Sequence, residues 1–136
     1  MGSRFSIPVP RDYNLSRDYC SYGYFLLEPN HWEPRTRMLS RILELADGPA
    51  RLDVVQDDGV GKPLAIRADR GLSKPERAEA QRLLSRMLRL DEDHEHIREF
   101  HKLDPRWKKS GRGRLMRSPT LFEDVIKTVT SCNVTW

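Results

Sequence analysis

The side chains with the clearest chemical potential are positive charges gathered in one short segment. Between residues 102 and 117, seven basic side chains accompany a single acidic one, Asp104. They are Lys102, Arg106, Lys108, Lys109, Arg112, Arg114 and Arg117. Positive charge concentrated beside the start of a helix is typical of a surface that contacts nucleic-acid phosphates. The alternative is a solvated, flexible loop, and the charge pattern alone does not decide between the two.

Residues suited to nucleophilic or metal chemistry are sparse and poorly spaced. Cys20 and Cys132 have no histidine near them in the sequence, so Cys–His catalysis has no support. His94, His96 and His101 lie among carboxylates, but two histidines that share a metal on a helix are separated by four positions. His94 and His96 would point to different sides of a helix. The sequence therefore predicts a solvated acidic face, with no metal and no cofactor.

The composition is that of a small polar domain. The chain has 136 residues, a net charge of +4, 38% hydrophobic residues and a mean hydropathy of −0.69. No run approaches the roughly 20 apolar residues that a membrane helix requires, and the N-terminus lacks the apolar segment of a signal peptide. Two cysteines far apart in the chain do not make a disulfide scaffold. We therefore expect a reducing, cytoplasmic location and no membrane.

The sequence of residues 5–34 predicts short strands and a short helix, which would help to position the basic segment. Residues 5–9 alternate apolar side chains with a proline, which is typical of an edge strand. Asn14 can cap a short helix that ends before Gly23. Residues 24–27 form a second strand candidate, whereas residues 28–34 contain two prolines and indicate a loop or turn.

Residues 36–68 predict a three-stranded antiparallel meander. Residues 37–45 fit either a strand or a helix, but the turn at 47–48 that follows favours the strand. Leu52 and Val54 then share one face of a second strand. The third strand follows another glycine-containing turn and has the same alternation. The strands predicted before residue 36 would complete a curved antiparallel sheet with this meander.

After Gly71 the apolar spacing becomes helical. Ser73 and Glu76 make a capping box for a helix that continues to about residue 90. A second helix is predicted over residues 92–103, and the Asp-Pro pair at 104–105 ends it. Strands followed by helices indicate an α+β fold.

The C-terminal stretch predicts a third helix. Ser118 can cap it with Pro119 at its first position, and Thr120 with Glu123 offers a second capping box one turn later. Glu123 and Asp124 lie on its polar side, where we assign them capping roles and not general-base chemistry. Five apolar side chains form one stripe along the helix: Leu121, Phe122, Val125, Ile126 and Val129. The stripe and the apolar end of the chain predict a truncated end or a surface that expects a partner.

Three motifs carry a resemblance to a known family. They read Arg-Ser-Pro-Thr-Leu-Phe-Glu-Asp-Val-Ile-Lys-Thr at 117–128 with Ser-Cys-Asn-Val-Thr-Trp at 131–136, Gly-Tyr-Phe-Leu-Leu-Glu-Pro-Asn-His-Trp at 23–32, and Leu-Arg-Leu-Asp-Glu-Asp at 88–93. In their order along the chain they resemble the helix-hairpin-helix (HhH-GPD) DNA glycosylases, in particular the bacterial 3-methyladenine and 8-oxoguanine enzymes. The resemblance implies a twisted antiparallel sheet like half of the TATA-binding protein, followed by three helices. The last of them would begin a helical domain that carries the hairpin.

The resemblance also implies site residues. Asn133 would enter the DNA helix and fill the gap left by an extruded base, and the alternative is an ordinary helix-capping asparagine. Gly23 would present its main-chain carbonyl to the lesion, although the Gln-x-Phe-x-Trp usual after that glycine is absent and a helix-terminating glycine is the alternative. The DNA backbone contacts would come from the basic segment: Lys108, Lys109, Arg112, Arg114 and Arg117.

For function, the resemblance implies the N-terminal portion of a base-excision-repair DNA glycosylase. Such an enzyme flips a damaged purine, 8-oxoguanine or an alkylated adenine, out of double-stranded DNA and cleaves its N-glycosidic bond. The hairpin and the catalytic Asp have no match here, so we expect no catalytic residue in this chain and a missing C-terminal half as its partner. The expected division is a domain at 1–104, a basic link at 105–117 and the first helix of a truncated domain at 118–136, in a nucleoid-associated protein. A non-catalytic DNA-binding module and a protein-docking domain are the alternatives.

Overall fold

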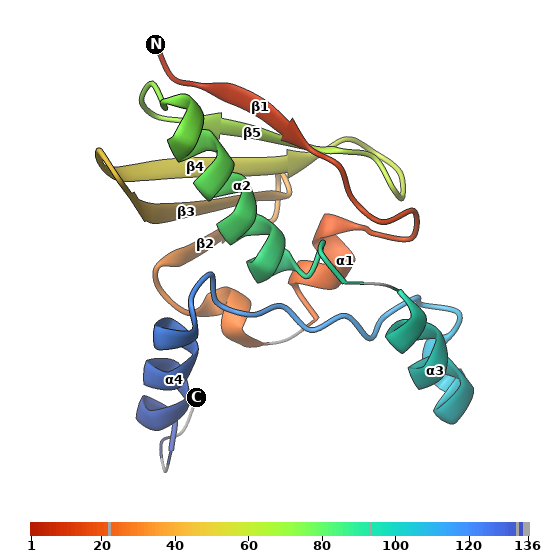
Figure 1. Ribbon diagram of the computed structural model, residues 1–136. Coiled ribbons are helices and arrows are strands. Elements are labelled where there is room, and N and C mark those ends of the chain that lie inside the picture. Colours follow the sequence, from red (N-terminus) through yellow and green to blue (C-terminus); the bar gives the residue numbers. More distant parts are fainter. Residues whose placement is uncertain (22, 93, 133, 135–136) are drawn as a thin grey trace.

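The structure, a computed structural model, describes all residues of the chain except 22, 93, 133, 135 and 136. Five antiparallel strands form one sheet in the order β1-β5-β4-β3-β2 (Figure 1). The strands are β1 (Arg4–Ile7), β2 (Asn30–Glu33), β3 (Met38–Leu45), β4 (Gly48–Gln56) and β5 (Leu64–Ala68). The α+β class and the antiparallel sheet predicted from the sequence are therefore confirmed.

Strands β3, β4 and β5 form the meander that the alternation predicts. Leu39 of β3 lies opposite Val54 of β4, which lies opposite Ile66 of β5. All three side chains are buried. The residues before and after each of them on its own strand point to the other face of the sheet, because successive side chains alternate along a strand. β1 takes one edge of the sheet, as predicted for a strand followed by a proline.

The other edge strand differs from the prediction. The sequence predicts a loop over residues 28–34, but Asn30–Glu33 pairs with β3 as strand β2. The strand is four residues long and lies between two prolines, so its alternation is too short to recognise in the sequence. Its hydrogen-bond partners on β3 come later in the chain.

The strand predicted at residues 24–27 is wrong. Gly23–Leu26 instead form a 3₁₀ helix, η1, and Gly23 begins this element without ending the previous helix. Phe25 of η1 packs on Tyr19 with 5.9 Å between ring centroids, and Trp32 of β2 packs on the same ring at 5.4 Å. Of the apolar run that suggests a strand, Phe25 is the residue that joins this aromatic cluster, whereas Leu26 is exposed.

The remaining elements are helical. They are α1 (Leu15–Tyr19), α2 (Lys74–Leu88), α3 (Glu95–Leu103), the 3₁₀ helix η2 (Pro105–Trp107) and α4 (Leu121–Thr130). Asn14 caps α1 as predicted, since its side chain accepts the N–H of Arg17 at 2.9 Å. Ser73 and Glu76 form the predicted capping box of α2. Among the described residues, no helix is long and apolar enough to cross a membrane.

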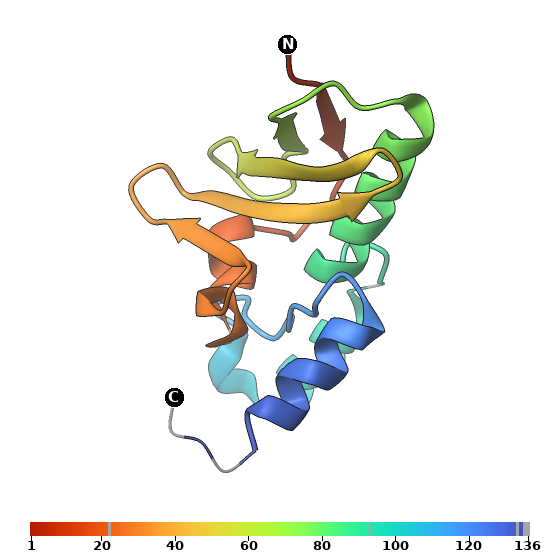
Figure 2. The ribbon, with the colours of Figure 1, turned by 90° about the vertical axis from the view of Figure 1, so that its left-hand side faces the viewer.

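Helix α2 covers one face of the sheet and builds the core with it (Figure 1). Its buried apolar side chains are Ala80, Leu83, Leu84, Met87 and Leu88. They pack with the inward-facing residues of β3, β4 and β5, and Tyr13, Leu15 and Tyr19 extend this core around α1. The opposite face of the sheet carries no helix of the described chain (Figure 2).

Helix α4 begins later than its first predicted cap. Thr120 is the N-cap, with its hydroxyl accepting the N–H of Glu123 at 3.3 Å. Ser118 is buried before the helix, and its N–H bonds to Asp124 Oδ1 at 2.8 Å. The predicted helix start at Ser118 and Pro119 is therefore wrong, because the extended backbone of Thr120 sets the start of the helix and Ser118 lies before it. Thr120 caps the helix as predicted, but the predicted capping box with Glu123 is incomplete, since the described structure has no bond from Glu123 to the Thr120 N–H.

Candidate nucleic-acid interface

Three of the predicted phosphate contacts lie at the surface of the segment after η2. Lys108, Lys109 and Arg112 are exposed, and none forms an ion pair with a carboxylate of the described chain. The segment turns at Gly111, whose φ of +70° is in the left-handed region that favours glycine. The turn is closed by the Gly111 N–H, which donates to the carbonyl of Trp107 at 3.0 Å. These three cations are available to a polyanion.

Arg114 differs from its neighbours because its side chain is buried. It is 5% exposed and forms ion pairs with Asp18 at 3.4 Å and with Asp12 at 3.5 Å. Its guanidinium also lies 5.3 Å from the ring centroid of Tyr13. Burial raises the pKa of the Tyr13 hydroxyl above its ordinary range, so the ring remains neutral beneath this charge. Arg114 thus fastens the basic segment to α1 and does not face a ligand.

The charge of Arg117 is paired with carboxylates of the same chain. Its guanidinium lies 2.9 Å from Glu92 and 3.4 Å from Asp91, and its Nε donates to the carbonyl of Arg86 at 3.2 Å. The acidic cluster before α3, visible in the sequence, is therefore the partner of this arginine. Of the six predicted DNA contacts, three are exposed, two are held by carboxylates, and Asn133 lies outside the described residues.

Further basic side chains extend the exposed charge along α3. One hollow of about 520 Å³ is lined by Arg11, Arg98 and His101. Arg17 also lies on its wall, but its guanidinium is ion-paired with Asp18 at 2.9 Å. A second hollow of about 480 Å³ lies beside it, lined by Arg98, His101, Lys102, Pro105 and Lys108. His101 Nε2 lies 2.6 Å from the carbonyl of Arg112, which joins α3 to the segment. The spacing of Arg98, His101 and Lys102 on one helical face could have indicated this surface from the sequence.

Gly23 lies exposed at the first position of η1. A Cβ built at this glycine would meet nothing within 4 Å. No described neighbour therefore requires a glycine here, and a close approach would have to come from a bound ligand. The proposed contact between its carbonyl and a lesion remains a prediction.

A buried ion pair connects the sheet to α4. Arg41 of β3 is 4% exposed, donates to Asn30 Oδ1 at 2.5 Å and contacts Glu123 of α4. Lys127 Nζ donates to the same carboxylate at 2.6 Å. Burial acts to raise the pKa of Glu123, but the bonds from Lys127 and Arg41 outweigh it and leave this pKa below its usual value. Glu123 is thus an anion held by two cations, and it positions α4.

The apolar side of α4 has no cover in the described chain. Phe122 is 76% exposed, Leu121 69% and Val129 64%, and Val125 and Ile126 are each about half exposed. Within the described residues no group of three or more His, Cys, Asp or Glu side chains could hold a metal ion. The arrangement offers cationic contacts and an open apolar helix face.

Comparison with known proteins finds a likeness among solved structures. No family model matches the sequence, and no curated protein matches it either. Among solved structures, the fold is similar to a 3-methyladenine DNA-glycosylase from Archaeoglobus fulgidus, with a TM-score of 0.71 and 16% sequence identity. The match covers 96% of this chain and 45% of that chain, so this chain spans just under half the length of the glycosylase it resembles. At this identity the likeness shows the shared fold.

Proposed function

We propose that this chain is the N-terminal portion of a DNA glycosylase of base-excision repair. The supporting observation is the fold, which matches under half of a 3-methyladenine DNA-glycosylase along nearly all of this chain. A helix whose apolar face is uncovered follows the sheet, as expected if further helices pack on it in the complete enzyme. The division into 1–104, 105–117 and 118–136 belongs to this proposal, as does a nucleoid-associated, cytoplasmic location.

In this proposal the intact enzyme flips a damaged purine and cleaves its N-glycosidic bond. Flipping costs the stacking and pairing energy of the base, and a side chain that fills the gap lowers that cost. We assign that role to Asn133 and a place in the pocket wall to Gly23. The catalytic Asp and the hairpin would come from the missing C-terminal half, so this chain alone releases no base.

Lys108, Lys109 and Arg112 would bind the backbone of double-stranded DNA. Neutralising phosphates releases counterions, so the logarithm of the binding constant falls with the logarithm of salt by about 0.9 for each contact. The triple variant K108Q/K109Q/R112Q should bind a 20-base-pair duplex more weakly and with a slope smaller by about 2 to 3. Fluorescence anisotropy between low and physiological salt measures both quantities.

A matched control carries the same loss of charge elsewhere. Lys62, Lys74 and Arg77 are exposed and form no ion pair with described carboxylates, so K62Q/K74Q/R77Q changes the net charge equally. If both triple variants lose the same affinity, the interface is wrong and only the net charge matters. Downstream coding DNA without a glycine-rich hairpin and a following Asp would contradict the glycosylase proposal itself.

The exposed face of α4 also supports a second candidate, a protein-docking domain. Burying Leu121, Phe122 and Val129 against another chain would remove apolar surface that is now in water. Sedimentation of the chain over a range of concentrations, without DNA, tests it. Association that is abolished by Phe122→Ser, together with no affinity for duplex DNA, would favour docking over repair.

A further inference from the structure

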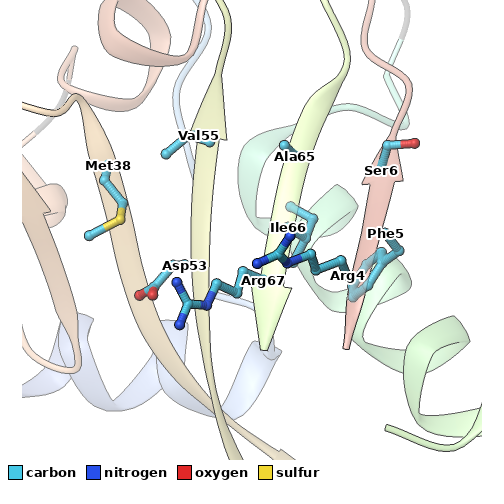
Figure 3. A pocket seen from close by; sticks show the side chains of 9 residues that line it. All are labelled: Arg4, Phe5, Ser6, Met38, Asp53, Val55, Ala65, Ile66 and Arg67. Atoms are coloured by element: carbon cyan, nitrogen blue, oxygen red, sulfur yellow. The ribbon is translucent and has the colours of Figure 1, made fainter. Parts of the chain in front are cut away.

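The uncovered face of the sheet carries a hollow of about 510 Å³ (Figure 3). Its lining comes from β1, β5, β4 and β3: Arg4, Phe5, Ser6, Met38, Asp53, Val55, Ala65, Ile66 and Arg67. This face is opposite to α2, and in Figure 1 it lies at the end of the molecule away from α3. It is therefore separate from the candidate nucleic-acid interface.

A polar row crosses the hollow from strand to strand. Arg4 of β1 lies opposite Arg67 of β5, which lies opposite Asp53 of β4, which lies opposite Ser40 of β3. Figure 3 shows the side chains of both arginines extending over this face towards Asp53. The register thus brings two positive charges into one cross-strand pair.

The charges in this row are unequally compensated. Asp53 Oδ1 accepts the hydroxyl of Ser40 at 2.6 Å and the Nε of Arg51 at 3.1 Å, so this carboxylate already has a cationic partner. Arg4 and Arg67 form no ion pair and no side-chain hydrogen bond with any described residue. Like charges directly opposite one another destabilise a sheet, and an anion shared by both guanidinium groups would relieve this repulsion.

An apolar row lies beside the arginine pair. Ala65 and Val55 are two residues along their strands from Arg67 and Asp53, and Met38 lines the same hollow from β3. Two residues along a strand span about 6.6 Å. An extended peptide lying along the strands has the same spacing between residues i and i+2. The surface thus matches an acidic side chain followed, two residues later, by an apolar one.

We propose that this face binds an extended segment of a partner protein with that pattern, acidic at i and apolar at i+2. Its carboxylate bridges Arg4 and Arg67, and its apolar side chain covers Ala65 and Val55. A nucleic-acid backbone suits the hollow less well, because phosphodiesters gain nothing from the apolar row. The inference does not depend on glycosylase function.

The test uses the 136-residue chain and an array of blocked nonapeptides in which acidic residues precede apolar ones by two positions. A matched array replaces every Asp and Glu with Asn and Gln. The strongest binders are then measured by fluorescence anisotropy on wild type, R4Q/R67Q and A65E. Both arginines and Ala65 are exposed, so the variants retain the buried core. R35Q/R77Q is the control, since these two arginines are also exposed but lie outside the hollow.

We expect acidic peptides to bind wild type, with affinity reduced at least about tenfold in R4Q/R67Q and in A65E and within about twofold of wild type in the control. Backbone amide shifts should change on β1, β5 and β4 when peptide is added. The proposal is overturned if no acidic peptide binds, if the uncharged array binds equally, or if R4Q/R67Q binds as wild type does. It is overturned equally if a single-stranded oligonucleotide displaces the peptide and needs the same two arginines.

Discussion

Helices α2 and α4 start alike and end in different environments. Each has a hydroxyl residue at its N-cap, Ser73 or Thr120, and a glutamate three positions later, Glu76 or Glu123. Each also has apolar side chains at helical spacing. In their capping residues and apolar spacing, the two helices are therefore alike in the sequence.

The structure separates them. Glu76 accepts the N–H of Ser73 at 3.0 Å, and this bond completes the capping box. Glu76 also forms an ion pair with Arg70. Glu123 pairs with Arg41 and Lys127, and no bond returns from it to the N–H of Thr120 in the described structure. The apolar side of α2 is buried against the sheet, whereas that of α4 faces water. Helical spacing therefore predicts an apolar face but does not say whether this chain supplies the surface that covers it.

The largest expected difference between the two helices is the loss of stability when an apolar side chain of each is truncated to alanine. Leu84 of α2 is fully buried, so Leu84→Ala should lower the free energy of unfolding by about 2–5 kcal/mol through lost burial and a cavity. Val129→Ala in α4 should change it by less than about 0.5 kcal/mol, because Val129 is exposed. Urea unfolding measures both. Equal losses would show that α4 is packed in solution and would remove the contrast.

The second effect is a dependence on pH at the start of α2. Bonds from Arg70, and then from the N–H groups of Ser73 and Asp47, outweigh burial and lower the pKa of Glu76 from 4.5 to about 2. The folded state thus binds its proton less readily than the unfolded state does. This stabilisation is complete above pH 4.5 and is lost as the pH falls towards 2.

Glu76→Gln removes that contribution. The variant should melt at a lower temperature than wild type at pH 7, and the difference should shrink between pH 5 and pH 2. Calorimetric scans across this range provide the measurement. Glu44→Gln, which changes an exposed carboxylate on β3, is the control and should show no such convergence. A constant difference at every pH would mean that Glu76 stabilises α2 without its charge.

The third effect concerns the attachment of α4. Glu123→Gln weakens the bonds to Arg41 and Lys127 and should cost about 1–2 kcal/mol. Since few other buried contacts hold α4, the loss should appear as faster amide hydrogen exchange in residues 121–130, with little change in α2. Uniformly faster exchange across α2 and α4 would show instead that both helices unfold in one cooperative step.

The smallest effect compares the two caps. Ser73→Ala and Thr120→Ala should each cost about 1 kcal/mol of local helix stability. Only Ser73→Ala should reduce global stability, because α2 belongs to the core and α4 is attached at its edge. Thermal melts and exchange measurements on the same samples distinguish the two. A global loss with Thr120→Ala would place α4 within the cooperative unit.

Local patterns predicted most of the fold. Alternation at Leu52, Val54 and Ile66 predicted the meander because one face of each strand is buried along its length. The sequence missed β2 because four residues are too few to show a period. The apolar residues 24–27 suggested a strand, but they begin with a 3₁₀ helix that packs on Tyr19.

The candidate site was harder to predict because the sequence does not show whether a charged side chain is buried or exposed. Arg112 and Arg114 are two residues apart, but one is exposed and the other is buried against Asp12 and Asp18, about a hundred positions earlier in the chain. Nothing near Arg114 in the sequence indicates those partners. The exposed arginine pair on the sheet face was missed for the same reason, since Arg4 and Arg67 become neighbours only through the strand register.

The guanidinium of Arg41 limits how this fold can be recombined. It projects from β3 and ends on a carboxylate of α4, so the sheet and the last helix are chemically matched although some eighty positions separate them. A chimaera joined anywhere between the two would leave a buried cation without its counter-charge, unless the donor helix has an acid at the same turn. In designing fusions or split forms of this chain, the residue to inspect first is therefore the one facing Arg41, whatever the sequence at the junction.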